Sequence, residues 1–177
     1  MVDEFVPAAG RNVPTVAYDF LIALSARERK LRGGVISAVE ASMRMIDSPR
    51  ILEVGCGTGT LSIALALELQ RAHVSALDID RAALSIARTK PGAERVEWIQ
   101  GRADNPPPEP ESWDCVVISL VLHHLQPDQQ SLALVAAHAA LRPGGTLHVI
   151  DFGPPRGLLP RLGWPLLQRI DGRSNTE

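Results

Sequence analysis

The feature that most constrains this chain is a short apolar run followed by a loop with glycine at every second position. Residues 51–59 read Ile-Leu-Glu-Val-Gly-Cys-Gly-Thr-Gly. Glycine has no Cβ and adopts backbone angles closed to other residues, so a ligand can lie directly against such a loop. Residues 60–70 are apolar at helical spacing. The loop therefore joins a strand to a helix, which makes a nucleotide-like binding site at the carboxyl end of a parallel strand.

Two kinds of nucleotide-like ligand suit a unit of this type. The dinucleotide fingerprint is G-x-G-x-x-G, and counted from Gly55 its last glycine would fall on Thr60. The order here is instead Glu53-x-Gly55-x-Gly57-x-Gly59. This order resembles the first motif of the class I S-adenosylmethionine-dependent methyltransferases.

The later segments agree with this resemblance in order and spacing. An apolar strand ends at Asp78, where a carboxylate can accept hydrogen bonds from both ribose hydroxyls. A Leu-Arg-Pro-Gly-Gly turn at residues 141–145 leads into the last strand. The strands expected after the first one lie at residues 72–77, 96–100, 113–119 and 146–150. In the family, these segments carry the ribose-binding acid, the adenine loop, the substrate-side loop and the fifth strand.

The predicted fold class is α/β, a Rossmann-like, doubly wound and mostly parallel sheet. Strands alternate with expected helices at residues 60–70, 80–89 and 128–141, and right-handed crossovers place such strands in one sheet with helices on both faces. The resemblance implies the strand order 3-2-1-4-5, with the ligand crevice between strands 1 and 4. We expect the chain to lack the last two strands that are usual in the family. The strand at 146–150 would then be a sheet edge, which favours a homodimer or coverage by the C-terminal segment.

Three regions are expected along the chain. Residues 1–48 form an N-terminal helical cap, with two helices over 16–47 separated by Gly33 and Gly34. Residues 49–152 form the cofactor-binding core. Residues 153–177 form an amphipathic segment and a polar tail, in which leucines alternate with arginines. This segment is either a lid over the pocket or sheet edge, or an element that contacts a membrane surface or a lipid substrate.

The resemblance implies that S-adenosylmethionine is the cofactor. Glu53 would either receive a hydrogen bond from the methionine end or fix the loop backbone. Asp80 is expected to cap the next helix. Arg102 stands where many family members have the adenine-binding Asp, so either Asp104 or the backbone takes that role. The cofactor-binding residues expected from the resemblance are Glu53, Gly55, Cys56, Gly57, Thr58, Gly59, Asp78, Ile79, Ala103, Asp104 and Ser119.

His123 and His124 follow the fourth strand and, in the family, this position faces the methyl-transfer centre. A histidine there can act as a general base because its pKa lies near neutral pH. The alternative is that the pair lines the pocket and hydrogen-bonds the backbone. We treat both residues as the candidate catalytic groups.

Composition restricts the class of protein. A chain of 177 residues is one domain, and its net charge of −2 gives no indication of a nucleic-acid partner. Cys56 and Cys115 have no metal-ligand or redox spacing, so no metal is expected. The N-terminus lacks the order of a signal peptide, and no apolar run reaches the roughly 20 residues of a transmembrane helix. These features favour a cytoplasmic protein.

The resulting prediction is an S-adenosylmethionine-dependent methyltransferase (class EC 2.1.1) that acts on a small-molecule or lipid-like acceptor. The His-His-Leu stretch and the Leu-Arg-Pro-Gly-Gly turn resemble the group that contains quinone, sterol and phospholipid methyltransferases. One alternative is a non-catalytic S-adenosylmethionine-binding or truncated methyltransferase-like protein. Another is a nicotinamide-dependent oxidoreductase, against which Thr60 and the complete set of methyltransferase segments argue. The acceptor atom, whether oxygen, nitrogen or carbon, stays open.

Overall fold

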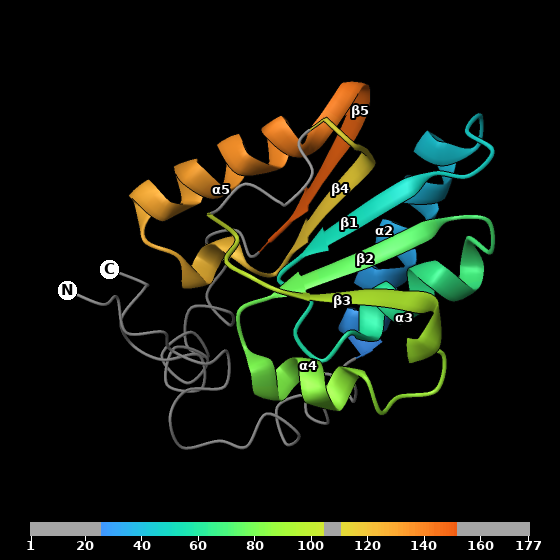
Figure 1. Cartoon of the computed structure of the whole chain (residues 1–177), viewed down its shortest axis with the longest axis horizontal. Helices are drawn as coiled ribbons and strands as arrows, with labels where there is room; N and C mark the ends of the chain where they lie inside the picture. Colours follow the sequence, from blue (N-terminus) through green and yellow to red (C-terminus); the bar gives the residue numbers. More distant parts are fainter. Residues whose placement is uncertain (1–25, 105–110, 152–177) are drawn as a thin grey trace.

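The computed structural model describes residues 26–104 and 111–151 (Figure 1). A five-stranded sheet has the order β3-β2-β1-β4-β5, and every neighbouring pair is parallel. The predicted α/β class and strand order are therefore confirmed. The strands are β1 (Arg50–Val54), β2 (His73–Asp78), β3 (Val96–Gln100), β4 (Trp113–Ser119) and β5 (Leu141–Ile150). The helices are α2 (Ala26–Met43), α3 (Thr60–Glu68), α4 (Arg81–Ala87) and α5 (Pro127–Ala140), with short 3₁₀ turns η1 (Ala93–Arg95) and η2 (Leu122–His124).

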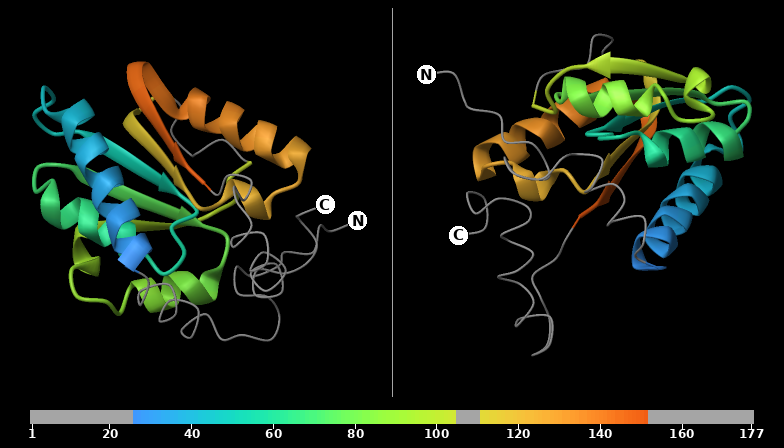
Figure 2. Two further views of the ribbon diagram at one scale, coloured as in Figure 1. Left: turned by 180° about the vertical axis from the view of Figure 1, so that it is seen from behind. Right: turned by 90° about the horizontal axis from the view of Figure 1, so that it is seen from below.

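Helices cover both faces of the sheet because successive residues of a strand point to opposite faces. Ile51 belongs to a core cluster that includes residues of α2, α3 and α4, whereas its neighbour Leu52 belongs to a second cluster that includes residues of α5. Seen from behind, α2 runs across the sheet (Figure 2). Six of the seven residues of β4 are buried, as expected for a parallel strand covered on both faces. Within the two described ranges, no helix is both long and apolar enough to cross a membrane.

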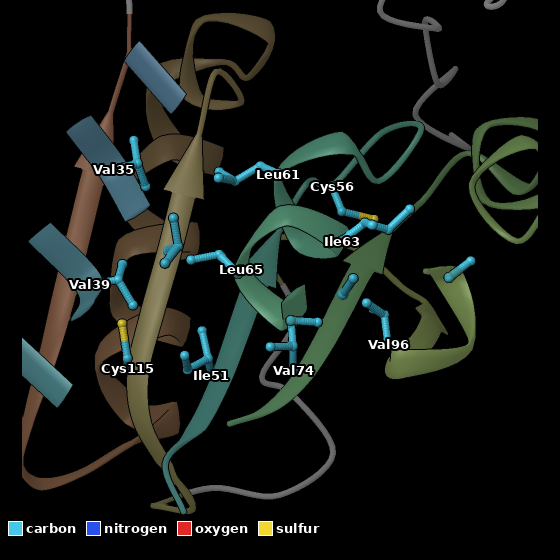
Figure 3. Packing of buried hydrophobic residues seen from close by; sticks show 14 of the residues in the cluster. Val35, Val39, Ile51, Cys56, Leu61, Ile63, Leu65, Val74, Val96 and Cys115 are labelled. Carbon is cyan, nitrogen blue, oxygen red and sulfur yellow. The ribbon is translucent and has the colours of Figure 1, made fainter. Parts of the chain in front are cut away.

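The larger of the two cores lies between the sheet and helices α2 and α3 (Figure 3). Leu65 of α3 and Val39 of α2 are fully buried there. Strand residues from β1 to β4 supply the other wall of this core. Its labelled side chains in Figure 3 are Val35, Val39, Ile51, Cys56, Leu61, Ile63, Leu65, Val74, Val96 and Cys115.

Helix α2 corrects one expectation, because it continues through Gly33 and Gly34 instead of ending there. A mid-helix glycine costs about 1 kcal/mol relative to alanine. Val35, Val39 and Met43, which follow the glycines, are all buried against the sheet and α3, and this burial outweighs the local cost. The rest of the expected N-terminal cap, residues 1–25, lies outside the described residues, so the domain boundary at residue 48 stays a prediction.

Strand β5 begins at Leu141, directly after α5, and is thus longer than expected. Leu141 pairs with Trp113 of β4. The buried carboxylate of Asp114 supports this pairing, since its Oδ1 lies 2.6 Å from Arg142 Nε and its Oδ2 accepts a 2.7 Å hydrogen bond from the Arg50 amide. Asp114 therefore joins the starts of β1, β4 and β5. Strand β5 is an edge of the described sheet. The expected amphipathic segment, residues 153–177, lies outside the described residues, and the homodimer stays a prediction.

Removal of the buried Leu65 side chain tests this packing. Leu65 is fully buried between α3 and the sheet, so we expect Leu65→Ala to lower the free energy of unfolding by about 2–5 kcal/mol. The matched control is Leu67→Ala on the same helix, where the side chain is 48% exposed and the change should stay within about 0.5 kcal/mol. Urea denaturation followed by circular dichroism measures both. Equal losses in the two variants would contradict the observed face of α3.

Candidate functional site

The glycine loop after β1 is fastened to the end of β2. The amides of Gly55 and Cys56 donate to the Leu77 carbonyl at 2.7 and 3.0 Å. The Gly57 amide donates to Asp78 Oδ2 at 2.6 Å. The carboxyl ends of β1 and β2 are also adjacent in the sheet, since Val54 pairs with Leu77. The loop and the Asp78 carboxylate therefore form one unit at the edge where a ligand of such a sheet binds.

The glycines of this loop differ in what surrounds them: protein side chains crowd Gly55 and Gly59 but not Gly57. A Cβ on Gly55 would lie 2.0 Å from Val121, and one on Gly59 would lie 2.2 Å from the Trp98 ring, so packing of the protein itself requires both. Gly57 has a φ of +52° and no atom within 4 Å of where its Cβ would lie. No side chain of the protein therefore covers the main chain at Gly57 on this side. A ligand can approach the backbone there, which fits a nucleoside-type cofactor.

Asp80 caps a helix, as expected, whereas ribose binding by Asp78 stays a prediction. Asp80 caps α4, since its carboxylate accepts from the Ala82 amide at 2.8 Å. The Asp80 amide in turn donates to Asp78 Oδ1 at 2.8 Å. Burial raises the pKa of Asp78, and the backbone donors act in the opposite direction. Ile79 lies between the two acids and is half-buried.

Glu53 lies beneath the loop and is only 2% exposed. Its carboxyl group accepts a hydrogen bond from the Ser62 hydroxyl of α3. Burial is the main cause that raises the pKa of Glu53 to about 8, with the nearby Asp78 adding to it. Burial therefore favours the protonated form of Glu53, and its contact with Ser62 ties β1 to the helix that follows the loop. A contact with the methionine end of a cofactor stays a prediction.

Lys90 supports the loop from the far side and was not expected from the sequence. Its Nζ donates to Thr58 Oγ1 at 2.9 Å and to Thr60 Oγ1 at 3.1 Å. Thr58 and Cys56 are both buried, and burial raises the pKa of the Cys56 thiol. The Cys56 side chain packs in the larger core, and contacts of Cys56 and Thr58 with a cofactor stay predictions. The sequence signal for Lys90 is weak, because it is one lysine in a turn 32 residues from Thr58.

The expected adenine segment starts beside Asp78, where the Gly101 amide donates to the Asp78 carbonyl at 2.9 Å. Asp104 forms a bidentate ion pair with Arg102, in which Nε donates to Oδ1 at 2.8 Å and Nη2 donates to Oδ2 at 2.7 Å. This hydrogen bonding lowers the pKa of Asp104. Ala103 packs against the core under α5. Arg102 stands at the position where many family members have an adenine-binding Asp, and here it orients Asp104. An adenine contact by Asp104 stays a prediction.

The histidine pair lies in η2, after Ser119 at the end of β4. The two rings are in contact, with centroids 3.9 Å apart. His123 Nδ1 lies 2.6 Å from Asp151 Oδ1. Burial, with a smaller effect of His123, lowers the pKa of His124 to about 4. No role is predicted for Asp151 from the sequence, although an acid that follows the fifth strand is expected to lie at this edge of the sheet.

The protonation of Glu53 gives a testable pH dependence. Its pKa is raised in the folded chain, so the unfolded chain releases the proton first and stability falls as the pH rises from about 4.5 towards 8. This one group contributes a slope of at most about 1.4 kcal/mol per pH unit. Glu53→Gln, which cannot ionise, should remove that contribution from urea denaturation curves measured between pH 5 and 8. The control is Glu68→Gln on the exposed side of α3. If the unfolding free energies of Glu53→Gln and of this control depend on pH with the same slope, Glu53 is ionised in the folded chain.

Comparisons with known proteins agree with this geometry. The model of the methyltransferase domain family matches residues 51–145. Demethylmenaquinone methyltransferase of Clavibacter sepedonicus is 32% identical over 133 residues, which are 75% of this chain and 53% of the relative. Phthiotriol/phenolphthiotriol dimycocerosates methyltransferase 1 of Mycobacterium ulcerans is 33% identical over 109 residues, 62% of this chain and 40% of the relative.

Solved structures show the same fold. CalS10 of Micromonospora echinaspora, an amino pentose methyltransferase with bound S-adenosylmethionine, superposes with a TM-score of 0.60 at 23% identity, over 82% of this chain and 59% of CalS10. The chain spans less than two thirds of each of these three proteins. The family model, however, covers more than half of the chain. The chain therefore belongs to the methyltransferase domain family of class I S-adenosylmethionine-dependent methyltransferases.

Proposed function

We propose that this chain transfers a methyl group from S-adenosylmethionine to a small, lipid-like acceptor. The observation that carries the proposal is the Gly57–Asp78 unit, in which bare main chain faces open space beside a carboxylate. S-adenosylmethionine supplies a methyl group already activated on a sulfonium. The protein must then align donor and acceptor, which can lower the barrier by about 7–11 kcal/mol in favourable cases.

The chain's residues would divide this work by position. The glycine loop would hold the cofactor against its backbone, and the Asp78 carboxylate would accept hydrogen bonds from the ribose hydroxyls. Ile79 and the segment of Ala103 and Asp104 would contact the adenine. Ser119 lies at the carboxyl end of β4, the strand that pairs with β1. This position is at the crevice where the strand order reverses, and Ser119 would line it on the cofactor side.

Of the two candidate bases, we assign the proton transfer to His123. His124 has a pKa lowered to about 4 by burial, so it is a weak base. His123 contacts the Asp151 carboxylate at 2.6 Å. A base whose imidazole is oriented by a carboxylate has the arrangement used for proton abstraction in other enzymes. His124 would pack against His123 and line the pocket.

Two observations favour an acceptor with an apolar tail. The similar proteins named above act on demethylmenaquinone and on dimycocerosates, according to their names. In addition, a cleft of about 760 Å³ lies between α2 and the free side of β5. Its lining includes Ile150, the residue before Asp151. The other lining residues are apolar or small except for two, Lys30 and His148; they are Lys30, Leu31, Gly34, Val35, Ala38, Leu147, His148 and Val149.

Cofactor binding is tested first by titration calorimetry with S-adenosylhomocysteine. We expect micromolar binding by the 177-residue chain, equivalent to about −8 kcal/mol. Asp78→Asn should weaken it by roughly 10- to 100-fold, since a hydrogen bond to a charged group contributes about 1.5–3 kcal/mol. The control is Asp80→Asn, in which the helix cap is kept. A folded chain that binds NADH instead would refute the proposal, and binding without turnover of any acceptor would favour the non-catalytic alternative.

The acceptor tail is tested with Val149→Asp. Val149 lines the cleft and is 43% exposed, so the substitution places a charge there without opening the core. With a naphthoquinol that carries an isoprenoid tail, we expect KM to rise by about tenfold or more, from the loss of about 1.5–3 kcal/mol of apolar burial. The same head group without a tail should be unaffected.

The control for this test is Val135→Asp on α5, where the side chain is 66% exposed. It should change neither KM. Loss of both activities, or of neither, would contradict a tail in the cleft. A change of oligomeric state in Val149→Asp alone would identify the cleft as a contact between copies of the chain.

A further inference from the structure

We infer that Asp151 is a positioning residue that holds His123 in the tautomer needed for a general base. The inference rests on the proposed function, because it concerns how that base is prepared. Asp151 follows β5, whereas His123 follows β4, and the two are 28 residues apart in the chain. Parallel pairing of these strands, with Ser119 opposite Ile150, brings both residues to one edge of the sheet.

The Asp151 carboxylate contacts the histidine turn through both oxygens. Oδ1 lies 2.6 Å from His123 Nδ1. Oδ2 accepts hydrogen bonds from the amides of Leu122 at 2.7 Å and of His123 at 3.3 Å. The two side chains are only 14% and 16% exposed, and such bonds are strengthened where water is excluded. One carboxylate therefore fixes both the backbone of the turn and the ring that it carries.

The turn is also held from its other side, so Asp151 acts on a rigid frame. The Leu120 amide donates to the Ile150 carbonyl at 2.8 Å. The Gln130 side chain of α5 donates to the carbonyls of Leu122 and Leu125, both at 3.0 Å. With the backbone fixed in this way, the remaining freedom of His123 is the rotation and the tautomer of its imidazole. The Asp151 carboxylate restricts both.

The chemical consequence follows from what each atom can do. An ionised carboxylate only accepts hydrogen bonds, so His123 Nδ1 must carry the proton in this contact. A neutral imidazole with its proton on Nδ1 has its basic lone pair on Nε2. Without such a partner, the structure does not fix which ring nitrogen carries the proton. Asp151 thus assigns the role of proton acceptor to Nε2, an atom that is buried in this structure and that the acceptor must reach when it binds.

In the methyl transfer, an electron pair of the acceptor (a lone pair on oxygen or nitrogen, or a π pair at a ring carbon) forms the new bond to the methyl carbon, and the electrons of the broken carbon–sulfur bond stay on sulfur. The acceptor proton passes to His123 Nε2. The resulting imidazolium faces the Asp151 carboxylate, which stabilises the positive charge. Water then takes the proton and regenerates the base, so that the products are the methylated acceptor, S-adenosylhomocysteine and one proton.

The tautomer is measured directly by long-range ¹H–¹⁵N NMR of the full chain labelled at histidine, at a pH where His123 is neutral. Loss of one signal set in His123→Gln assigns the ring. We expect the proton on Nδ1 in the wild-type chain and on Nε2 in Asp151→Asn. The control is Asp128→Asn, an exposed acid at the start of α5, which should leave the ring unchanged. A wild-type proton on Nε2 would overturn the inference, and this measurement needs no variant.

Kinetics provide the second readout. With an acceptor that the wild-type chain methylates, Asp151→Asn should lower kcat by about 10- to 100-fold, within the range of general-base effects, and leave KM within about threefold. Binding of S-adenosylhomocysteine should stay unchanged. An unchanged kcat, or loss of cofactor binding along with kcat, would assign Asp151 a merely structural role. Failure of the wild-type chain to bind the cofactor would instead refute the proposed function, whichever tautomer is found.

Discussion

The parallel pairing of β1 with both β2 and β4 is the constraint on which the rest of the molecule depends. From Ile51 to Val54, β1 pairs with β2 on one side and with β4 on the other. Residues 51–54 are all buried. The loop that leaves β1 is therefore held at one position relative to β2 and β4. Asp78 and Ser119 end these two neighbouring strands, so strand pairing brings both to the edge of the sheet where the loop leaves β1.

Polar groups are buried around this central strand, and most of the cost of burying them is offset by specific partners. Asp114 joins β1, β4 and β5 at the amino end of the sheet through Arg50 and Arg142. At the other end, the Glu53 carboxyl group accepts a hydrogen bond from Ser62, and burial favours its protonated form. A carboxyl group without such a partner would cost several kcal/mol in this environment. These contacts specify the register of the sheet as well as its stability.

Local patterns were sufficient for most of the fold. Strands such as β4 are continuous apolar runs, and helix α4 follows an acid that caps it, so each is visible within about ten residues of sequence. The expected break at Gly33 and Gly34 was wrong because burial of Val35, Val39 and Met43 outweighs a local preference. The early start of β5 was missed for a similar reason. The start of β5 depends on the contact of Arg142 with Asp114, and no local sequence pattern predicts this contact.

Sequence patterns predict the order of strands and helices, the glycine loop and the acid that follows β2, because these features are set by the spacing of a few adjacent residues. The fold then determines which side chains act together. Lys90 reaches Thr58 across 32 residues, and Asp151 reaches His123 across 28. Such contacts exist only after the sheet has formed, since it is the pairing of strands, and not the distance along the chain, that brings their ends to one edge.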